Sequence, residues 1–171
     1  MFSFLKKKKS KNSIYGKIID DPAFGKLKYI PSWRKVEPIE VGFYGKTLEV
    51  TCCASTNQQA EEPNDPQRAA FTRFMAEKES LMRDCEKLLT DFFKPEDSFD
   101  MSDAVFIISL DISREGKCLL FMLFNEQYLF DFDLDELGIE HGQEFGVLLF
   151  PELKLLNSYE KYRNCLNGKE I

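Results

Sequence analysis

Residues 66–94 have the sequence PQRAAFTRFMAEKESLMRDCEKLLTDFFK, which predicts one long amphipathic helix. Apolar side chains recur at the spacing of a single helical face, and charged side chains lie on the opposite face. Asp65 is expected to cap the first turn, and Pro66 suits the first helical position, where no amide donor is needed. Pro95 is expected to end the helix, because the residue before a proline is pushed away from helical geometry. The predicted apolar face consists of Phe71, Phe74, Met75, Leu81, Met82, Cys85, Leu88, Leu89 and Phe92.

The residues before this helix alternate between apolar and polar side chains, a pattern that predicts β-strands. A short strand around Leu27 is expected to end at Pro31. Residues 39–44 and 48–53 alternate in the same way on either side of a predicted turn at Gly45-Lys46, so we expect a β-hairpin. The polar residues that follow lack periodicity and are predicted to lead into the helix as a loop.

The residues after the helix predict an acidic loop and then five further strands. The run CLLFMLF at 118–124 is apolar on both sides, which predicts the central strand of the sheet. The residues from 158 onward fit either a helix or a tail. The strand candidates lie at 105–112, 118–124, 128–134, 146–150 and 153–157.

Together these elements predict an α+β fold, with a mostly antiparallel sheet and the long helix packed on one face. Residues 1–20 are predicted to form a basic, disordered tail, and residues 21–171 a single domain. The N-terminal sequence MFSFLKKKKSKNS is too short for a signal peptide or a membrane span. Besides a solubilising tail, a weak contact of this segment with a membrane surface stays open.

The charge of the chain is unevenly distributed. The net charge is −6, but the remainder carries −11 once the five lysines between positions 6 and 11 are set aside. Residues 91–150 alone carry −11, with fourteen Asp and Glu. Because binding to phosphates requires a basic surface, no nucleic-acid partner is predicted. A protein partner with a basic surface fits this charge, and so does an acidic surface that serves solubility alone.

Five cysteines are present, an odd number, and they fall mostly inside apolar patterns without a C-x-x-C pair. This usage predicts reduced, buried thiols and a cytoplasmic protein. Cys52 and Cys53 are neighbours on a predicted strand and should point to opposite faces, which argues against a disulfide between them.

A run of carboxylates resembles the start of a calcium-binding loop, since Asp131, Asp133 and Asp135 alternate with apolar residues. The EF-hand pattern then fails, because Glu136 stands where the loop needs glycine and Gly142 where it needs a bidentate glutamate. No metal site is therefore predicted. The alternation instead places the carboxylates on one face of a strand, as an acidic strip for a basic partner. The predicted partner-binding residues are Asp131, Asp133, Asp135, Glu136, Glu140 and Glu144.

Catalytic motifs are absent from the sequence. His141 is the single histidine, which excludes three-histidine zinc sites and H-E-x-x-H. There is no G-x-S-x-G, and Gly138, Gly142 and Gly146 are too widely spaced for a phosphate-binding loop. No catalytic residue and no cofactor are predicted. A small enzyme or ligand-binding domain with a pocket between sheet and helix remains the alternative.

Several short sequences occur together: FGKL at 24–27 followed by Trp33, FYGK at 43–46, the helix from Pro66, and EHG at 140–142 ahead of GVLLF. Their combination resembles a group of uncharacterised small bacterial α+β proteins, a domain of unknown function. The resemblance covers about residues 24 to 150. Some of those proteins are encoded among immunity genes of polymorphic toxin systems. The resemblance implies a fold more than a function, and it supplies no site residues.

The predicted function is therefore a non-enzymatic protein-interaction module. It would bind a basic partner through the acidic strip.

Overall fold

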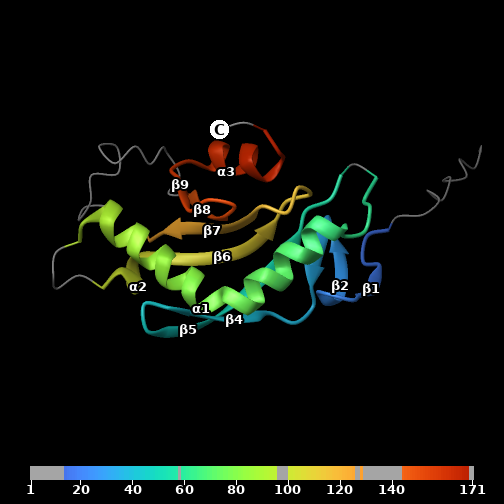
Figure 1. Ribbon diagram of the computed structural model, residues 1–171, viewed down its shortest axis with the longest axis horizontal. Coiled ribbons are helices and arrows are strands. Elements are labelled where there is room, and N and C mark those ends of the chain that lie inside the picture. Colours follow the sequence, from blue (N-terminus) through green and yellow to red (C-terminus); the bar gives the residue numbers. More distant parts are fainter. Residues whose placement is uncertain (1–13, 58, 96–99, 126–127, 129–143, 170–171) are drawn as a thin grey trace, which may run out of the picture.

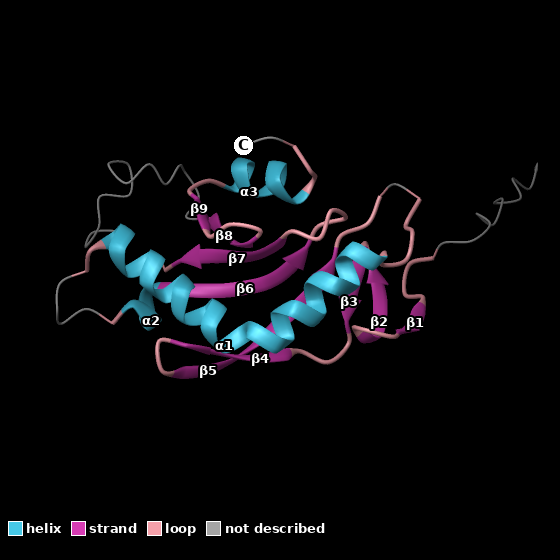
Figure 2. Cartoon of the chain, viewed as in Figure 1, coloured by secondary structure: helices cyan, strands magenta, loops and turns pink. Residues whose placement is uncertain are grey.

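A computed structural model of the chain describes residues 14–57, 59–95, 100–125, 128 and 144–169. In this part of the chain, nine strands form one sheet, and a long helix crosses one face of it (Figure 1). Figure 2 shows the same arrangement by class of element. We call the face under the long helix the inner face and the opposite face, on which the C-terminal helix packs, the outer face. The elements are β1 (Ile18–Asp21), β2 (Gly25–Ile30), β3 (Ser32–Lys35), β4 (Ile39–Phe43), β5 (Lys46–Ala54), α1 (Asp65–Phe93), α2 (Met101–Ala104), β6 (Val105–Ile112), β7 (Cys118–Phe124), β8 (Glu144–Phe150), β9 (Lys154–Leu156) and α3 (Tyr159–Leu166).

The strands lie in the order β1-β2-β3-β5-β6-β7-β8-β9, and β4 pairs with β5 beside this path. The pairing of β5 with β6 is parallel, and every other pair among the described strands is antiparallel. A parallel pair requires a crossover, and α1 supplies it. The α+β fold with one long helix on a mostly antiparallel sheet is therefore confirmed.

The helix α1 begins one residue earlier than predicted and uses a different cap. Asn64, not Asp65, is the N-cap, because the Asn64 side chain accepts a hydrogen bond from the Gln67 amide at 3.0 Å. The Gln67 side chain accepts one from the Asn64 amide in return, which completes a capping box. At the other end, Lys94 adopts the left-handed conformation, with φ 47°.

The buried face of α1 largely follows the predicted periodicity. Met75 departs from it, with 39% of the side chain exposed, and Leu88 and Phe92 are half-buried. The buried residues of the helix are Gln67, Ala70, Phe71, Phe74, Leu81, Met82, Cys85, Leu89 and Phe93.

The predicted β4–β5 hairpin is confirmed, but its turn is Tyr44-Gly45 rather than Gly45-Lys46. Both turn residues have positive φ, 46° and 76°, as a two-residue turn of type I′ requires. The strands β6 and β7 have the predicted bounds, and β7 is buried on both faces, as predicted. The predicted strand at 128–134 lies outside the described residues apart from Tyr128.

Three elements differ from the sequence-based expectation. The strand β2 ends at Ile30, directly before Pro31, as predicted, but an unpredicted strand, β3, begins at Ser32 and pairs with β2. The strand β1 includes Ile18, Ile19 and Asp20, which fall within the predicted tail, and it pairs with β2. The predicted acidic loop after α1 contains the short helix α2.

Two apolar clusters fill the two faces of the sheet. The large one lies between α1 and the inner face, and the small one lies between α3 and the outer face. Gly146 of β8 allows α3 to pack closely on the outer face, since a Cβ at this position would stand 2.5 Å from Cδ2 of Tyr162 in α3. The small cluster consists of Leu119, Leu148, Leu156, Tyr162 and Cys165.

Candidate functional site

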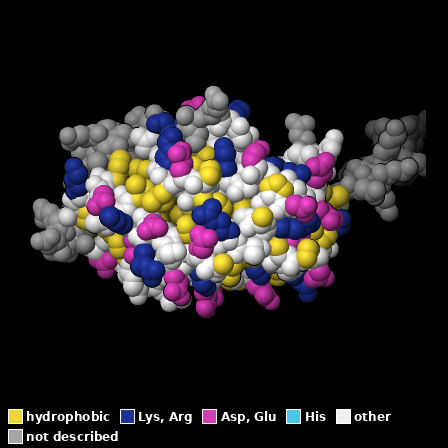
Figure 3. All heavy atoms as spheres, in the orientation of Figure 1, with side chains coloured by type: hydrophobic (Ala, Val, Ile, Leu, Met, Phe, Trp, Pro, Cys, Tyr) yellow, Lys and Arg dark blue, Asp and Glu magenta, His cyan; other side chains and the backbone are white. Residues whose placement is uncertain are grey.

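The predicted acidic strip falls mostly outside the described residues. Asp131, Asp133, Asp135, Glu136 and Glu140 all lie there, so the strip stays a prediction. Glu144 is described: it is the first residue of β8, is half-buried and lies opposite Leu123 of β7. Because its neighbour Phe145 is buried in the large cluster, Glu144 points to the outer face. Figure 3 shows the side of the molecule that carries α1, where acidic and basic side chains are interspersed over the described surface.

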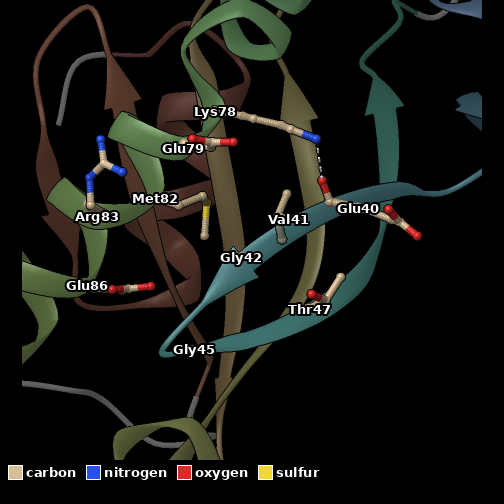
Figure 4. Close-up of a pocket in the computed structure, with 10 residues that line it drawn as sticks. All are labelled: Glu40, Val41, Gly42, Gly45, Thr47, Lys78, Glu79, Met82, Arg83 and Glu86. Carbon is tan, nitrogen blue, oxygen red and sulfur yellow. Dashed lines mark hydrogen bonds between the residues drawn. The ribbon is translucent and has the colours of Figure 1, made fainter.

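A surface groove of about 460 Å³ lies between β4 and α1 (Figure 4). Val41 of β4 and Met82 of α1 are its buried apolar residues, and Figure 4 shows Met82 pointing from the helix toward β4. Most of the other lining side chains are charged, and they are exposed or half-buried. The full lining is Glu40, Val41, Gly42, Gly45, Thr47, Lys78, Glu79, Met82, Arg83 and Glu86.

Hydrogen bonds join helix and hairpin at both ends of this groove. At the hairpin tip, the Tyr44 amide donates to Oε1 of Glu86 at 2.7 Å, and the Tyr44 hydroxyl donates to the Glu86 carbonyl at 2.8 Å. Burial raises the pKa of Tyr44 to about 12, so the hydroxyl keeps its proton at neutral pH. At the other end, the Lys78 ammonium donates to the Glu40 carbonyl at 3.0 Å, the dashed line in Figure 4. The groove therefore lies between two hydrogen-bonded contacts, four residues apart on the strand.

The edge of β4 that faces the groove is free of strand partners among the described residues. The two-residue turn makes Phe43 and Lys46 the hydrogen-bonded pair that closes the hairpin. Hydrogen-bonded and non-bonded pairs alternate along an antiparallel ladder, so the backbone groups of Gly42 and Glu40 point away from β5. The bond from Lys78 to the Glu40 carbonyl agrees with this direction. Gly42 carries no side chain, and a Cβ built there would meet no atom within 4 Å.

A pair of glutamates occupies the outer face beside this edge. Glu40 and Glu49 are direct cross-strand neighbours in the β4–β5 register, and both are exposed. Like charges in this position repel each other. Neither carboxylate has an ion-pair partner among the residues that the structure describes. The sequence pattern predicts an exposed face for both residues, but a turn at Gly45-Lys46 would pair Glu40 with Thr51 instead.

Exposed apolar side chains lie on the neighbouring strand β6. Phe106 is 44% exposed and Ile108 is 45% exposed, next to the irregularity in the β6–β7 pairing. Phe106 lies opposite Leu123, which itself lies opposite Glu144, so these residues form one row across the outer face. The helix α3 packs on the outer face beside this row, where the Tyr162 ring lies against Gly146 of β8.

A second polar cluster lies under α3. The Tyr162 hydroxyl and the Ser109 hydroxyl both donate to Oδ2 of Asp111, the latter at 2.6 Å. Burial raises the pKa of Asp111 in spite of these hydrogen bonds, and it also raises the pKa of Tyr162. Both donors are used within the cluster, so its effect is to hold α3 against the sheet.

The cysteines offer no activated nucleophile. All five are free and buried, as predicted. Burial raises the pKa of the Cys53 thiol to about 11 and that of Cys52 and Cys118 well above the ordinary value. Nucleophilic attack requires the thiolate, which burial disfavours at each of these positions.

Across the described ranges, no three His, Cys, Asp or Glu side chains gather as metal ligands would. No described helix combines the length and apolar character needed to cross a bilayer. No family model, curated protein or solved structure matches the chain.

Proposed function

We propose that this chain is a non-enzymatic protein-interaction module that binds a partner with a basic surface, in the manner of an immunity-type protein. The observation that carries the proposal is the exposed Glu40–Glu49 pair on the outer face. The pair is unfavourable in the free protein, and a lysine or arginine of a partner would relieve the repulsion on binding.

The surroundings of the pair have the composition of an interaction surface. Phe106 exposes apolar area on the same face, and Glu144 adds a carboxylate at the other end of its cross-strand row. Interfaces commonly combine an apolar centre with a polar rim. The acidic strip predicted at 131–140 precedes Glu144 in the sequence and carries the same sign of charge.

The alternative, an enzyme or ligand-binding domain with a pocket between sheet and helix, is favoured by the volume of the groove. Its lining contains no cysteine, histidine or serine, and most of it is exposed. We therefore favour binding over catalysis at this groove.

The test is partner capture from a lysate of the source organism, with the whole chain as bait, at about 50 mM and about 500 mM salt. Wild type should retain a basic protein at low salt and lose most of it at high salt. The double variant Glu40→Gln/Glu49→Gln should retain at least about tenfold less at low salt. The matched control is Asp91→Asn/Glu152→Gln, which removes two exposed carboxylates elsewhere and should behave as wild type. Capture that is insensitive to salt, or equal for the two double variants, would refute the proposal.

A further inference from the structure

The free edge of β4 stands beside a groove whose other wall is a helix. From this arrangement we infer that the groove binds an extended segment of a protein partner, which adds as a further strand to β4. The inference rests on the proposed interaction function and names its site and the form of the partner. Strand addition to an exposed sheet edge beside a helix is a general mode of peptide recognition.

The backbone of β4 supplies the hydrogen-bonding groups. The N–H and C=O of Gly42 point into the groove, and no described side chain or turn hydrogen-bonds to them. The Glu40 carbonyl also points there and is held by Lys78, whose long, flexible side chain can be displaced. An unsatisfied sheet edge is a template for pairing with another chain.

The length of the groove sets the length of the segment. Its two ends, at Glu40 and at Tyr44, are separated by about 13 Å of extended strand at roughly 3.3 Å per residue. On the helix, Lys78 and Glu86 are separated by about 12 Å at 1.5 Å per residue. The space therefore accommodates about four extended residues. The missing side chain at Gly42 keeps its centre open.

The side chains around the groove specify the chemistry of the segment. Successive side chains of an added strand point to opposite faces of the sheet. Those on the inner side would meet Val41 and Met82, which calls for apolar residues. Those on the outer side would continue the cross-strand row of Glu49 and Glu40, which calls for lysine or arginine. The ligand is therefore an extended segment in which apolar and basic residues alternate.

A second copy of this chain fits the site less well. Pairing of two β4 edges around Gly42 would bring two Glu40–Glu49 pairs onto one continuous sheet, where four carboxylates would repel one another. We therefore assign the site to a separate, basic segment.

The test uses the whole chain, isotope-labelled, and a blocked hexapeptide of alternating lysine and valine as the probe. Backbone amide signals of Glu40 and Gly42 should shift on titration, and exchange of the Gly42 amide hydrogen should slow by at least about tenfold at saturation. A peptide with glutamate in place of lysine should bind at least about tenfold more weakly. A lysine–valine peptide with a central proline should also bind more weakly, because it lacks a backbone donor.

Two substitutions on the protein side test the same hydrogen bonds. Gly42→Pro removes the edge-facing donor while leaving the β5 ladder intact, because proline is tolerated on edge strands where its nitrogen faces outward. It should weaken peptide binding at least about tenfold relative to Gly42→Ala, which keeps the donor and adds only a methyl group. If Gly42→Pro does not fold, the proline-containing peptide tests the same point on wild-type protein.

Several results would overturn the inference. The inference is wrong if the signal and the exchange rate of the Gly42 amide do not change on titration, or if the peptide shifts only the signals of Phe106 and Ile108. It is also wrong if the glutamate peptide binds as tightly as the lysine peptide, or if the free chain sediments as a dimer and its Gly42 amide is already protected from exchange. If the lysate partner is captured with the expected salt dependence while Gly42 is unaffected, the strand-addition site is wrong and the proposed function stands. If Glu40→Gln/Glu49→Gln instead captured the partner as well as wild type does, the proposed function itself would be contradicted.

Discussion

Glu40 and Glu49 lie directly opposite each other on β4 and β5, both exposed and neither in an ion pair with a described residue. Repulsion between the two carboxylates lowers the stability of the free protein, so reversing the charge of one of them should increase the stability. Glu49→Lys should raise the free energy of unfolding by about 0.5 kcal/mol, as expected for an attractive cross-strand pair replacing a repulsive one. Urea denaturation measures this change, with Glu152→Lys as the control for surface charge. A loss of stability in Glu49→Lys would show that the pair is not repulsive.

The start of α1 provides a second prediction. Because Asn64 makes the capping hydrogen bond, Asn64→Ala should cost about 1 kcal/mol of stability. Asp65→Ala should cost less than about 0.5 kcal/mol, since Asp65 makes one exposed ion pair with Arg68. Urea denaturation of the two variants side by side decides between the caps, and a larger cost for Asp65→Ala would restore Asp65 to that role.

Gln67 is fully buried, and its amide nitrogen donates to the carbonyls of Ser55 at 2.8 Å and Ile112 at 3.1 Å. These carbonyls stand at the ends of the parallel strands β5 and β6, so Gln67 ties the crossover helix to both. Gln67→Ala should lower the free energy of unfolding by about 2 to 3 kcal/mol, because it removes both hydrogen bonds, takes away the donor to the Ser55 carbonyl and removes half of the capping box. A cost below about 1 kcal/mol, measured by chemical denaturation, would show that these bonds are dispensable.

Two glycines on the sheet should respond in opposite ways to a methyl group. Gly146→Ala would force a Cβ into the Tyr162 ring and should cost about 2 kcal/mol as α3 is displaced. Gly42→Ala meets open space and should leave stability within about 0.5 kcal/mol of wild type. Thermal unfolding of the two variants tests this difference. Equal losses of stability in Gly146→Ala and Gly42→Ala would contradict the prediction.

The buried hydroxyl of Tyr44 should make the stability of the protein depend on pH in the alkaline range. Its folded-state pKa is raised by burial to about 12, above the unfolded value of about 10. A raised pKa in the folded state means that the stabilisation by the protonated hydroxyl is complete below pH of about 10 and is lost as the pH rises toward about 12. The stability difference between wild type and Tyr44→Phe should therefore be constant up to about pH 9.5 and shrink above it. Denaturation at a series of pH values measures this difference, and a constant value through about pH 11 would exclude the buried hydroxyl as its source.

Local features of the fold follow from the sequence because they depend on neighbouring residues. The helical spacing from Phe71 to Leu89 gives α1, and the apolar run CLLFMLF gives β7 with its observed bounds. The capping residue is less certain from pattern alone, since Asn64 and Asp65 are both good caps and backbone geometry selects between them. Pro31 ends β2, as its pattern suggests, but the pattern does not reveal that β3 begins directly after it at Ser32.

Features that depend on distant residues do not follow from local pattern. The parallel pairing of β5 with β6 is set by the path of α1 across the sheet. The free edge of β4 exists because β3 pairs with β5 at Cys53 and Ala54, beyond the end of β4. A turn shifted by a single residue changes the whole hairpin register, which is why the Glu40–Glu49 pair emerges only from the structure.

The most direct test of the central claim is the affinity of the captured partner for wild type and for Glu40→Gln/Glu49→Gln at two salt concentrations. If the glutamate pair binds a basic surface, the wild-type dissociation constant should rise at least about tenfold between about 50 mM and about 500 mM salt. The double variant should bind more weakly at low salt and depend less on salt. Equal affinities with equal salt dependence would contradict the assignment of this surface to a basic partner.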